Sequence, residues 1–160
     1  MNSTDCIQLV RENLLSKIDF FSQYEEITNK MLTCDTEQLS DYIIERQNLV
    51  SQIDVINQRL YTLYSQSNDA KLKQAALNQL NCGECPEQLK DVFFNGQKLS
   101  SIVSRILRKE EQVVSRVETQ KEILLNLIRE QNTGVTANAE KYYRTLKQFE
   151  NNYTIFNNKY

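Results

Sequence analysis

The residues of this chain that are best suited to chemistry are Cys82 and Cys85, a C-x-x-C pair. Two cysteines at this spacing supply half of a tetrahedral zinc site, and the same spacing occurs in redox-active dithiols. The other two thiols, Cys6 and Cys34, lie near opposite ends of one predicted helix. At a rise of about 1.5 Å per residue they are about 40 Å apart, so one metal site cannot use both.

Three interpretations of the C-x-x-C pair remain open. If Cys6 lies at the same end of the bundle, a site with three cysteines is geometrically allowed, but its fourth ligand is unaccounted for. A redox pair of the thioredoxin type needs a βαβ context, which this sequence lacks. We expect free thiols in a loop, with a metal site or a redox pair at Cys82 and Cys85 as the alternatives, and we expect no cofactor.

The chain contains no histidine. This absence excludes Ser-His and Cys-His catalytic pairs, histidine metal ligands and the Glu-x-x-His pattern of di-iron bundles. We therefore predict no catalytic residues and expect a protein that acts by binding and is not an enzyme.

The composition is ordinary for a soluble protein, with 40% hydrophobic and 25% charged residues. The net charge is −2 and no basic block occurs, which disfavours nucleic-acid binding because that function needs clustered Lys and Arg. No apolar run approaches the roughly 18 residues of a membrane span, and the N-terminus lacks the pattern of a signal peptide. We therefore expect a cytoplasmic protein with no membrane span and no nucleic-acid partner.

Helices are the elements that must position these residues, because the chain has only three glycines and one proline. Pro86, Gly83 and Gly134 fall between long stretches with helical periodicity. We expect one all-α domain over residues 1–160, an antiparallel helical bundle or coiled coil with one long helix and a short helical insert. Its expected parts are a helical hairpin at 4–66, an insert with the cysteine loop at 67–86, the long helix at 87–132 and an aromatic helix at 136–160.

The long helix carries the clearest periodicity, with one apolar stripe kept in register over about six heptads. Four residues, Gly96, Glu110, Gln120 and Gln131, interrupt the stripe without shifting its phase. A stripe of this length predicts a helix that packs along other helices. Its apolar members are Val92, Leu99, Val103, Ile106, Val113, Val117, Leu124 and Leu127.

Local signals place the other helices. Asp35 and Gln38 match a capping box, which predicts that the second helix begins near Thr36. Arg46 falls at a core position of that helix, so we expect its stem to pack while its charge reaches solvent or pairs with a Glu. A short helix is expected from Ala70 to Asn81.

The last predicted helix has an aromatic stripe on one face, at steps of four and three residues. The stripe is too apolar to remain in water, since each large apolar side chain gains roughly 1.5–3 kcal/mol on burial. It forms either the fourth helix of the core or a segment that docks reversibly and either covers a partner site or is itself that site. Its members are Tyr142, Leu146, Phe149, Tyr153, Phe156 and Tyr160.

Several stretches resemble the flagellar export chaperones of the FlgN/FliT family. The segment from Asp35 to Val50 resembles the second helix of that family, in which an acidic start and a Leu precede a basic residue and an apolar pair. The long helix after a variable insert is similar too, as is the Asn-Ala-Glu-Lys-Tyr segment that ends at Tyr142. The resemblance covers most of the chain outside residues 65–86. The cysteine-bearing connector and the aromatic last helix depart from the family pattern.

The resemblance implies a cytoplasmic chaperone that holds a late export client, of the hook-associated or filament-cap type, and delivers it to the export gate. By position, Tyr142 or the adjacent Tyr143 is the implied gate contact. We expect an amphipathic client helix to bind a groove formed by apolar faces of the long helix and its neighbours, although the residues of this groove could equally form the ordinary core of the bundle. A self-associating coiled-coil scaffold without a client is the alternative, and a homodimer remains open. The groove residues are Leu99, Val103, Ile106, Val113 and Val117.

Overall fold

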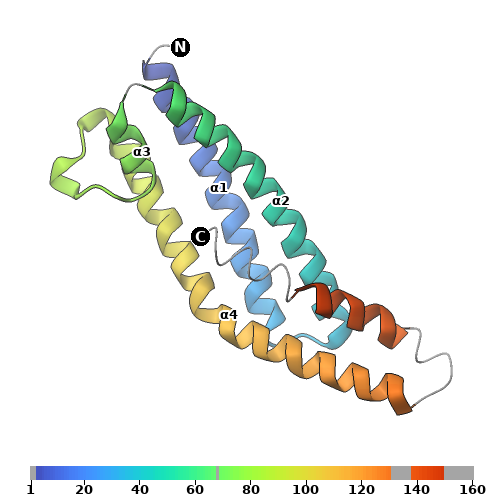
Figure 1. Ribbon diagram of the computed structural model, residues 1–160. Coiled ribbons are helices and arrows are strands. Elements are labelled where there is room, and N and C mark those ends of the chain that lie inside the picture. Colours follow the sequence, from blue (N-terminus) through green and yellow to red (C-terminus); the bar gives the residue numbers. More distant parts are fainter. Residues whose placement is uncertain (1–2, 68, 131–137, 150–160) are drawn as a thin grey trace. The chain divides into compact units, whose positions relative to one another are not determined.

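The computed structural model describes residues 3–67, 69–130 and 138–149, and this part of the chain is all-α, with no strand (Figure 1). Residues 138–149 are also helical. The predicted all-α bundle with one long helix and a short helical insert is confirmed. Its elements are α1 (Ser3–Met31), α2 (Thr36–Gln66), α3 (Ala70–Ala76), the short 3-10 turns η1 (Cys82–Glu84) and η2 (Glu87–Leu89), and α4 (Lys90–Glu130).

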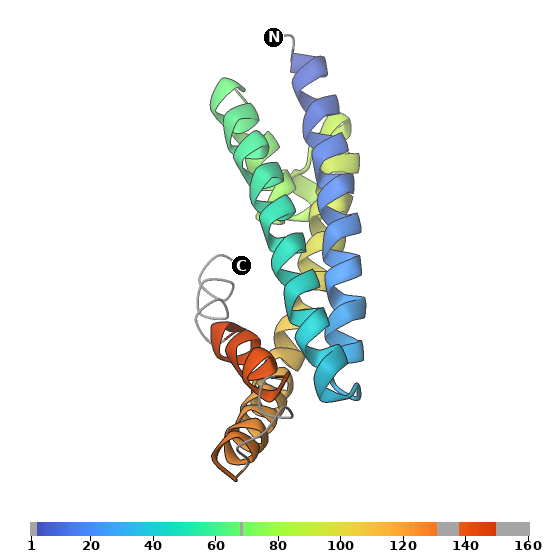
Figure 2. The same ribbon diagram turned by 90° about the vertical axis from the view of Figure 1, so that its right-hand side faces the viewer.

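The predicted capping box between α1 and α2 is confirmed. The amide of Gln38 donates to Oδ1 of Asp35 over 2.8 Å, and the amide of Asp35 donates to Oε1 of Gln38 over 3.3 Å. Two free amides at the start of α2 are thereby satisfied. The short turn that results places α1 and α2 side by side, as Figures 1 and 2 both show.

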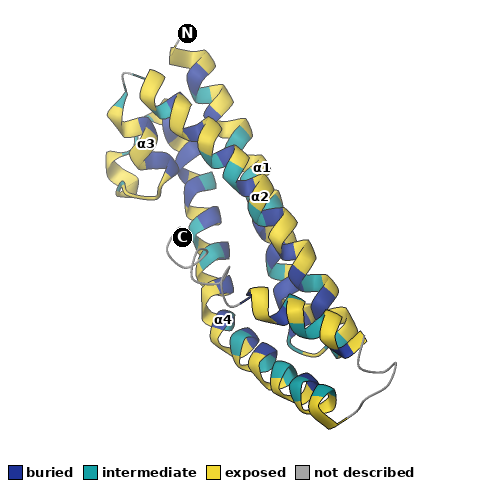
Figure 3. Ribbon diagram, turned by 45° about the vertical axis from the view of Figure 1, so that its right-hand side comes forward, coloured by how far each residue is buried: buried dark blue, intermediate teal, exposed yellow. Residues whose placement is uncertain are grey.

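The contacts of the chain divide into two compact units, and α1, α2 and α4 each contribute to both. The first unit combines α1 up to Gln23 with Ser51–Arg105, which includes α3 and the cysteine loop. The second unit combines Tyr24–Val50 with the chain from Ile106 onward. In both units, the long helices bury one face and expose the other, as Figure 3 shows.

In the first unit, α1 and α2 run antiparallel. The buried thiol of Cys6, near the start of α1, donates to the carbonyl of Leu63, near the end of α2, over 3.6 Å. The start of α4 runs parallel to α1, since Arg11 and Asp91 form an exposed ion pair at 3.4 Å. The described side chains that are fully buried in this unit are apolar, and Lys17 lies half-buried beside them.

The residues that interrupt the stripe of α4 each have a specific neighbour. Gly96 lies against the last turn of α3, Glu110 pairs with a buried arginine of α2, and Gln120 accepts a hydrogen bond of 2.6 Å from Thr36. Gln131 lies outside the described residues. The interruptions are therefore points of contact, which explains why the heptad phase survives them.

Two expectations are corrected. The short helix was expected to reach Asn81, but α3 ends at Ala76. Asn78 has a φ of 56°, and the amide of Gln79 donates to the carbonyl of Gln74 over 2.8 Å. This is a Schellman end, in which Asn takes the left-handed position that glycine usually fills.

Leu127 was expected in the core stripe, but it is 36% exposed. In the second unit, Gln120 bonds to the first residue of α2, so the last turns of α4 run beyond the turn between α1 and α2. Leu124 is the last residue of the stripe that is buried. Within the described residues, no helix is long and apolar enough to cross a membrane.

Because α3 approaches α4 closely at Gly96, we expect a Gly→Ala substitution to destabilise the protein here, although it normally stabilises a helix. A Cβ at Gly96 would lie 2.6 Å from the carbonyl oxygen of Ala75 and 2.7 Å from that of Ala76. Gly96→Ala should lower the free energy of unfolding by about 1–3 kcal/mol through overpacking, although Ala favours a helix by about 1 kcal/mol. Urea unfolding followed by circular dichroism measures the effect.

Gly83→Ala is the matched control, since nothing lies within 4 Å of its added Cβ. We expect this variant to unfold at the same urea concentration as the wild type, or slightly above it. If Gly96→Ala is as stable as Gly83→Ala, α3 does not pack on α4 at this distance.

Candidate functional site

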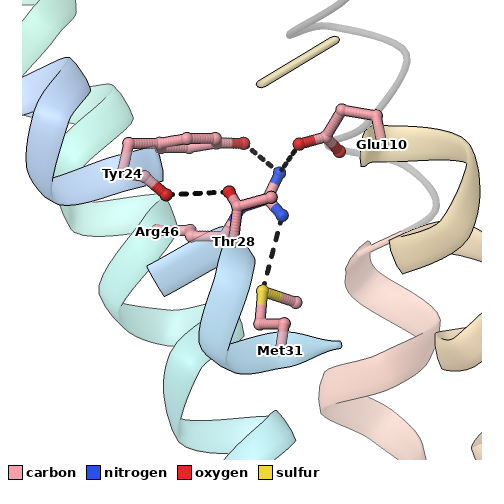
Figure 4. A network of polar contacts seen from close by, with 5 residues as sticks. All are labelled: Tyr24, Thr28, Met31, Arg46 and Glu110. Atoms are coloured by element: carbon pink, nitrogen blue, oxygen red, sulfur yellow. Dashed lines mark hydrogen bonds and ion pairs between the residues drawn. The ribbon is translucent and has the colours of Figure 1, made fainter. Parts of the chain in front are cut away.

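The second unit is built around a buried cation. The side chain of Arg46 comes from α2 and is 5% exposed, and that of Glu110, from α4, is 1% exposed. Nη2 of Arg46 donates to Oε1 of Glu110 over 2.6 Å and also to the hydroxyl oxygen of Tyr24 from α1 (Figure 4). Nη1 donates to the sulfur of Met31 over 3.4 Å. The sequence left open whether the charge of Arg46 reaches solvent or pairs with a Glu, and the structure shows the pairing.

Two aromatic rings cover the guanidinium. The central carbon of Arg46 lies 4.2 Å from the ring centroid of Tyr24 and 5.5 Å from that of Phe149. Both distances suit cation–π attraction, which is strongest where water is excluded. Burial by itself lowers the pKa of Arg46, but Tyr24 and Glu110 outweigh it and raise that pKa. Arg46 therefore stays charged.

One carboxylate oxygen of this cluster is left without a hydrogen bond. Oε2 of Glu110 is buried and has no partner among the described residues. An unsatisfied buried acceptor costs free energy, and so does taking two charges out of water. The cluster thus specifies which helices meet and in what register more than it adds stability.

The helical residues 138–149 close this site. Leu146 and Phe149, from the predicted docking stripe, are buried, and so is Ala139. The ring of Phe149 over Arg46 places this segment beside α2, next to which Figures 1 and 2 show it. The remaining stripe residues Tyr153, Phe156 and Tyr160 lie outside the described residues.

The two tyrosines implied as gate contacts, Tyr142 and Tyr143, are both half-buried. Burial raises the pKa of Tyr142, and so do the charge of Glu37 and a hydrogen bond to it. Tyr142 thus lies against the acidic start of α2. Its hydroxyl is engaged within the protein in this conformation.

The predicted groove residues are divided between the units. Leu99 and Val103 belong to the first unit, where Leu99 is buried and Val103 half-buried. Ile106, Val113 and Val117 belong to the second unit and are fully buried. That these residues line a client groove stays a prediction. Because they are buried or half-buried, a client could reach them only if the part of the protein that covers them moved.

All four cysteines are free. Cys82 is exposed and Cys85 is half-buried, both in the loop of the first unit. Among the described residues, no group of three or more Cys, Asp or Glu side chains is arranged to hold a metal ion. The three-cysteine site that the sequence left geometrically possible, with Cys6 beside the C-x-x-C pair, is therefore not present among these residues.

Lys17 is a titratable group that the sequence did not reveal. Burial lowers the pKa of Lys17 to about 8, while the charge of Asp54 opposes this effect. Its nitrogen lies 5.9 Å from the ring centroid of Phe21, one helical turn further along α1. The position of Lys17 beside apolar residues was visible in the sequence, but its depth depends on α2.

Comparison of the chain with protein-family models, with curated proteins and with solved structures finds no match.

Because Arg46 and Glu110 form a buried ion pair, we expect substitutions of the two residues to change the free energy of unfolding in a non-additive way. Arg46→Met leaves Glu110 buried and unpaired, so we expect a loss of about 3–5 kcal/mol in the free energy of unfolding. The double variant Arg46→Met with Glu110→Leu should regain most of this loss, because no charge remains buried. Arg11→Met breaks only the exposed pair with Asp91 and should cost less than about 1 kcal/mol.

A double-mutant cycle in urea, followed by circular dichroism, measures the coupling between Arg46 and Glu110. If the double variant is as unstable as Arg46→Met, the stability resides in the contacts of Arg46 with Tyr24 and Phe149 and the ion pair contributes little.

Lys17 predicts a dependence of stability on pH. Its pKa is about 8 in the folded protein and 10.5 is its ordinary value, which we assign to the unfolded chain. Between these values the unfolded state binds more protons, so the free energy of unfolding rises with pH, by up to about 3 kcal/mol. Lys17→Met removes this rise, whereas Lys98→Met, at an exposed position, retains it.

Urea unfolding at pH 7, 8.5 and 9.5 measures this difference. Burial raises the pKa of Tyr64 to about 12, so Tyr64 lowers stability only above pH 10 and does not interfere. An equal rise in wild type and Lys17→Met would show that Lys17 is hydrated.

Proposed function

We propose that the protein is a non-enzymatic chaperone that binds an amphipathic helix of another protein. The resemblance to the FlgN/FliT family indicates the client class, a late flagellar export protein of the hook-associated or filament-cap type. In this proposal the chaperone keeps the client helix covered in the cytoplasm and delivers it to the export gate.

The observation that carries the proposal is the docking of residues 138–149 on the second unit. This segment presents buried Leu146 and Phe149 at a step of three residues, and it places an aromatic ring over Arg46. An amphipathic helix with the same spacing can make the same contacts. The chain's own segment thus serves as an example of the ligand that the surface accepts.

The client replaces this segment and does not need a second, open groove. Ile106 and Val113 lie one helical turn to either side of Glu110, on the same face of α4. Phe149 contacts Arg46, the partner of Glu110, so the segment lies next to this face. In this proposal, release of residues 138–149 gives a client access to the surface beside Arg46, which adjoins the face of α4 that carries Ile106 and Val113.

Release would also free Tyr142. In the docked state its hydroxyl contacts Glu37. In the client-bound state the same hydroxyl would be available to the export gate. Client binding and presentation of the gate contact are thereby linked, because both require the same segment to leave.

The scaffold alternative has one observation in its favour. Ile123 and Leu127, one turn apart near the end of α4, are 47% and 36% exposed. A second chain could cover these residues, and light scattering on the purified protein tests this alternative.

The proposal predicts that undocking the segment tightens client binding. Leu146→Asp with Phe149→Asp should lower the dissociation constant for a client helix by at least about tenfold, because the competing segment no longer docks. Asn138→Asp with Gln148→Asp is the control, since it adds the same charge at exposed positions and should leave the affinity unchanged.

Calorimetric titration with amphipathic helices of hook-associated and filament-cap proteins from the same genome measures the dissociation constant. Failure of every client to bind the wild type and both variants would overturn the chaperone proposal. Equal affinities of both variants would place the client site away from residues 138–149.

A further inference from the structure

The proposed function makes no use of the C-x-x-C pair of the first unit. Cys82 begins η1 and is exposed, and Cys85 follows that turn and is half-buried. The loop that carries both lies between α3 and α4 (Figure 1). Nothing lies within 4 Å of the Cβ position of Gly83, between the two cysteines, so the turn is open on its outer side.

The turn is held in shape by its own hydrogen bonds. The amide of Glu84 donates to the carbonyl of Asn81 over 2.9 Å, and the amide and side-chain nitrogens of Asn81 donate to Oε2 of Glu84 over 3.3 and 3.1 Å. After Pro86, the buried side chain of Leu89 anchors the loop to the first unit. The two thiols are therefore presented from a fixed turn.

The geometry of the turn suits a pair of metal ligands. Cys82 and Cys85 lie three residues apart across the single 3-10 turn η1, which is the spacing that supplies half of a tetrahedral zinc site. Cys82 is exposed, and the thiol of Cys85 donates to the carbonyl of the adjacent Pro86 over 3.6 Å. A bound zinc ion removes the thiol protons itself, so no neighbouring base is required.

The described residues of one chain do not complete such a site. Cys6 is buried with its thiol on the carbonyl of Leu63, and Cys34 belongs to the second unit. Among residues 3–67, 69–130 and 138–149, no third ligand joins Cys82 and Cys85. A tetrahedral site needs four ligands, and two C-x-x-C pairs supply them.

We propose that Cys82 and Cys85 bind one zinc ion together with the same two residues of a second copy of the chain. The exposed turn allows the two pairs to approach about a two-fold axis, which is the commonest symmetry of homodimers. Four thiols release four protons to solvent as the Zn–S bonds form, and no redox step is involved. The site links two copies of the first unit.

The test uses the full chain, kept reduced, and zinc chloride as the only added ligand. We expect half an equivalent of bound zinc per chain, a dimer by light scattering, and a return to monomer with a chelator. X-ray absorption should show sulfur ligands alone, at about 2.3 Å from zinc. Binding should weaken as the pH falls, because protons compete for the thiolates.

Cys82→Ser and Cys85→Ser should each lose both the zinc and the dimer and keep the helical signal in circular dichroism. Cys34→Ser is the matched control, since it removes a thiol of the second unit, and it should still form the zinc-dependent dimer. The proposal is overturned by one zinc per monomer, by a dimer that persists without zinc, or by no zinc uptake. It is also overturned if uptake survives in the Cys82→Ser and Cys85→Ser variants.

Discussion

A single buried cation determines which helices must meet in the second unit. Arg46 is almost fully buried, and a guanidinium cannot be left there without partners because it does not give up its charge. Its partners come from each of the other described helices of that unit: Tyr24 from α1, Glu110 from α4 and Phe149 from the last described helix. Each segment is therefore fixed in rotation and register by one side chain, in a way that apolar contacts alone would not achieve.

The same constraint extends along the second unit. Arg116 of α4 donates to the carbonyls of Leu32 and Cys34, which follow the end of α1 and lack partners in the helix. Thr36, the first residue of α2, donates to Gln120. These contacts and the Arg46 cluster recur about every helical turn or two on α4. The first unit uses a different solution, in which apolar packing and the close fit at Gly96 dominate.

Much of the fold could be predicted because it follows from local rules. The capping box at Asp35 and the stripe of α4 are local patterns, and both appear in the structure. The partner of Arg46 could not be predicted, since a stripe tells which face of a helix is buried but not what lies opposite. Glu110 could be seen in the sequence as a charged residue within the apolar stripe of α4. Since Arg46 falls at a core position of α2, the two opposite charges could have been paired with each other.

The early end of α3 could also have been predicted from the sequence, because Asn78 is among the residues that tolerate the left-handed conformation. The exposure of Leu127 had no such signal, since it depends on where the hairpin of α1 and α2 ends.

The buried cation also bears on how the proposed client gains access. Burial of Leu146 and Phe149 holds the last segment in place with about 3–6 kcal/mol, taking roughly 1.5–3 kcal/mol for each side chain. In the proposed release, the ring of Phe149 leaves Arg46, and water would then reach an ion pair whose desolvation penalty is several kcal/mol per ion. Oε2 of Glu110, which has no partner in the described protein, also gains a hydrogen bond when water enters. The gain in hydration opposes the loss of apolar burial, so the docked and released states lie closer in free energy than the apolar contacts alone imply. A segment balanced in this way can be displaced by a client helix of moderate affinity, which an entirely apolar core would resist.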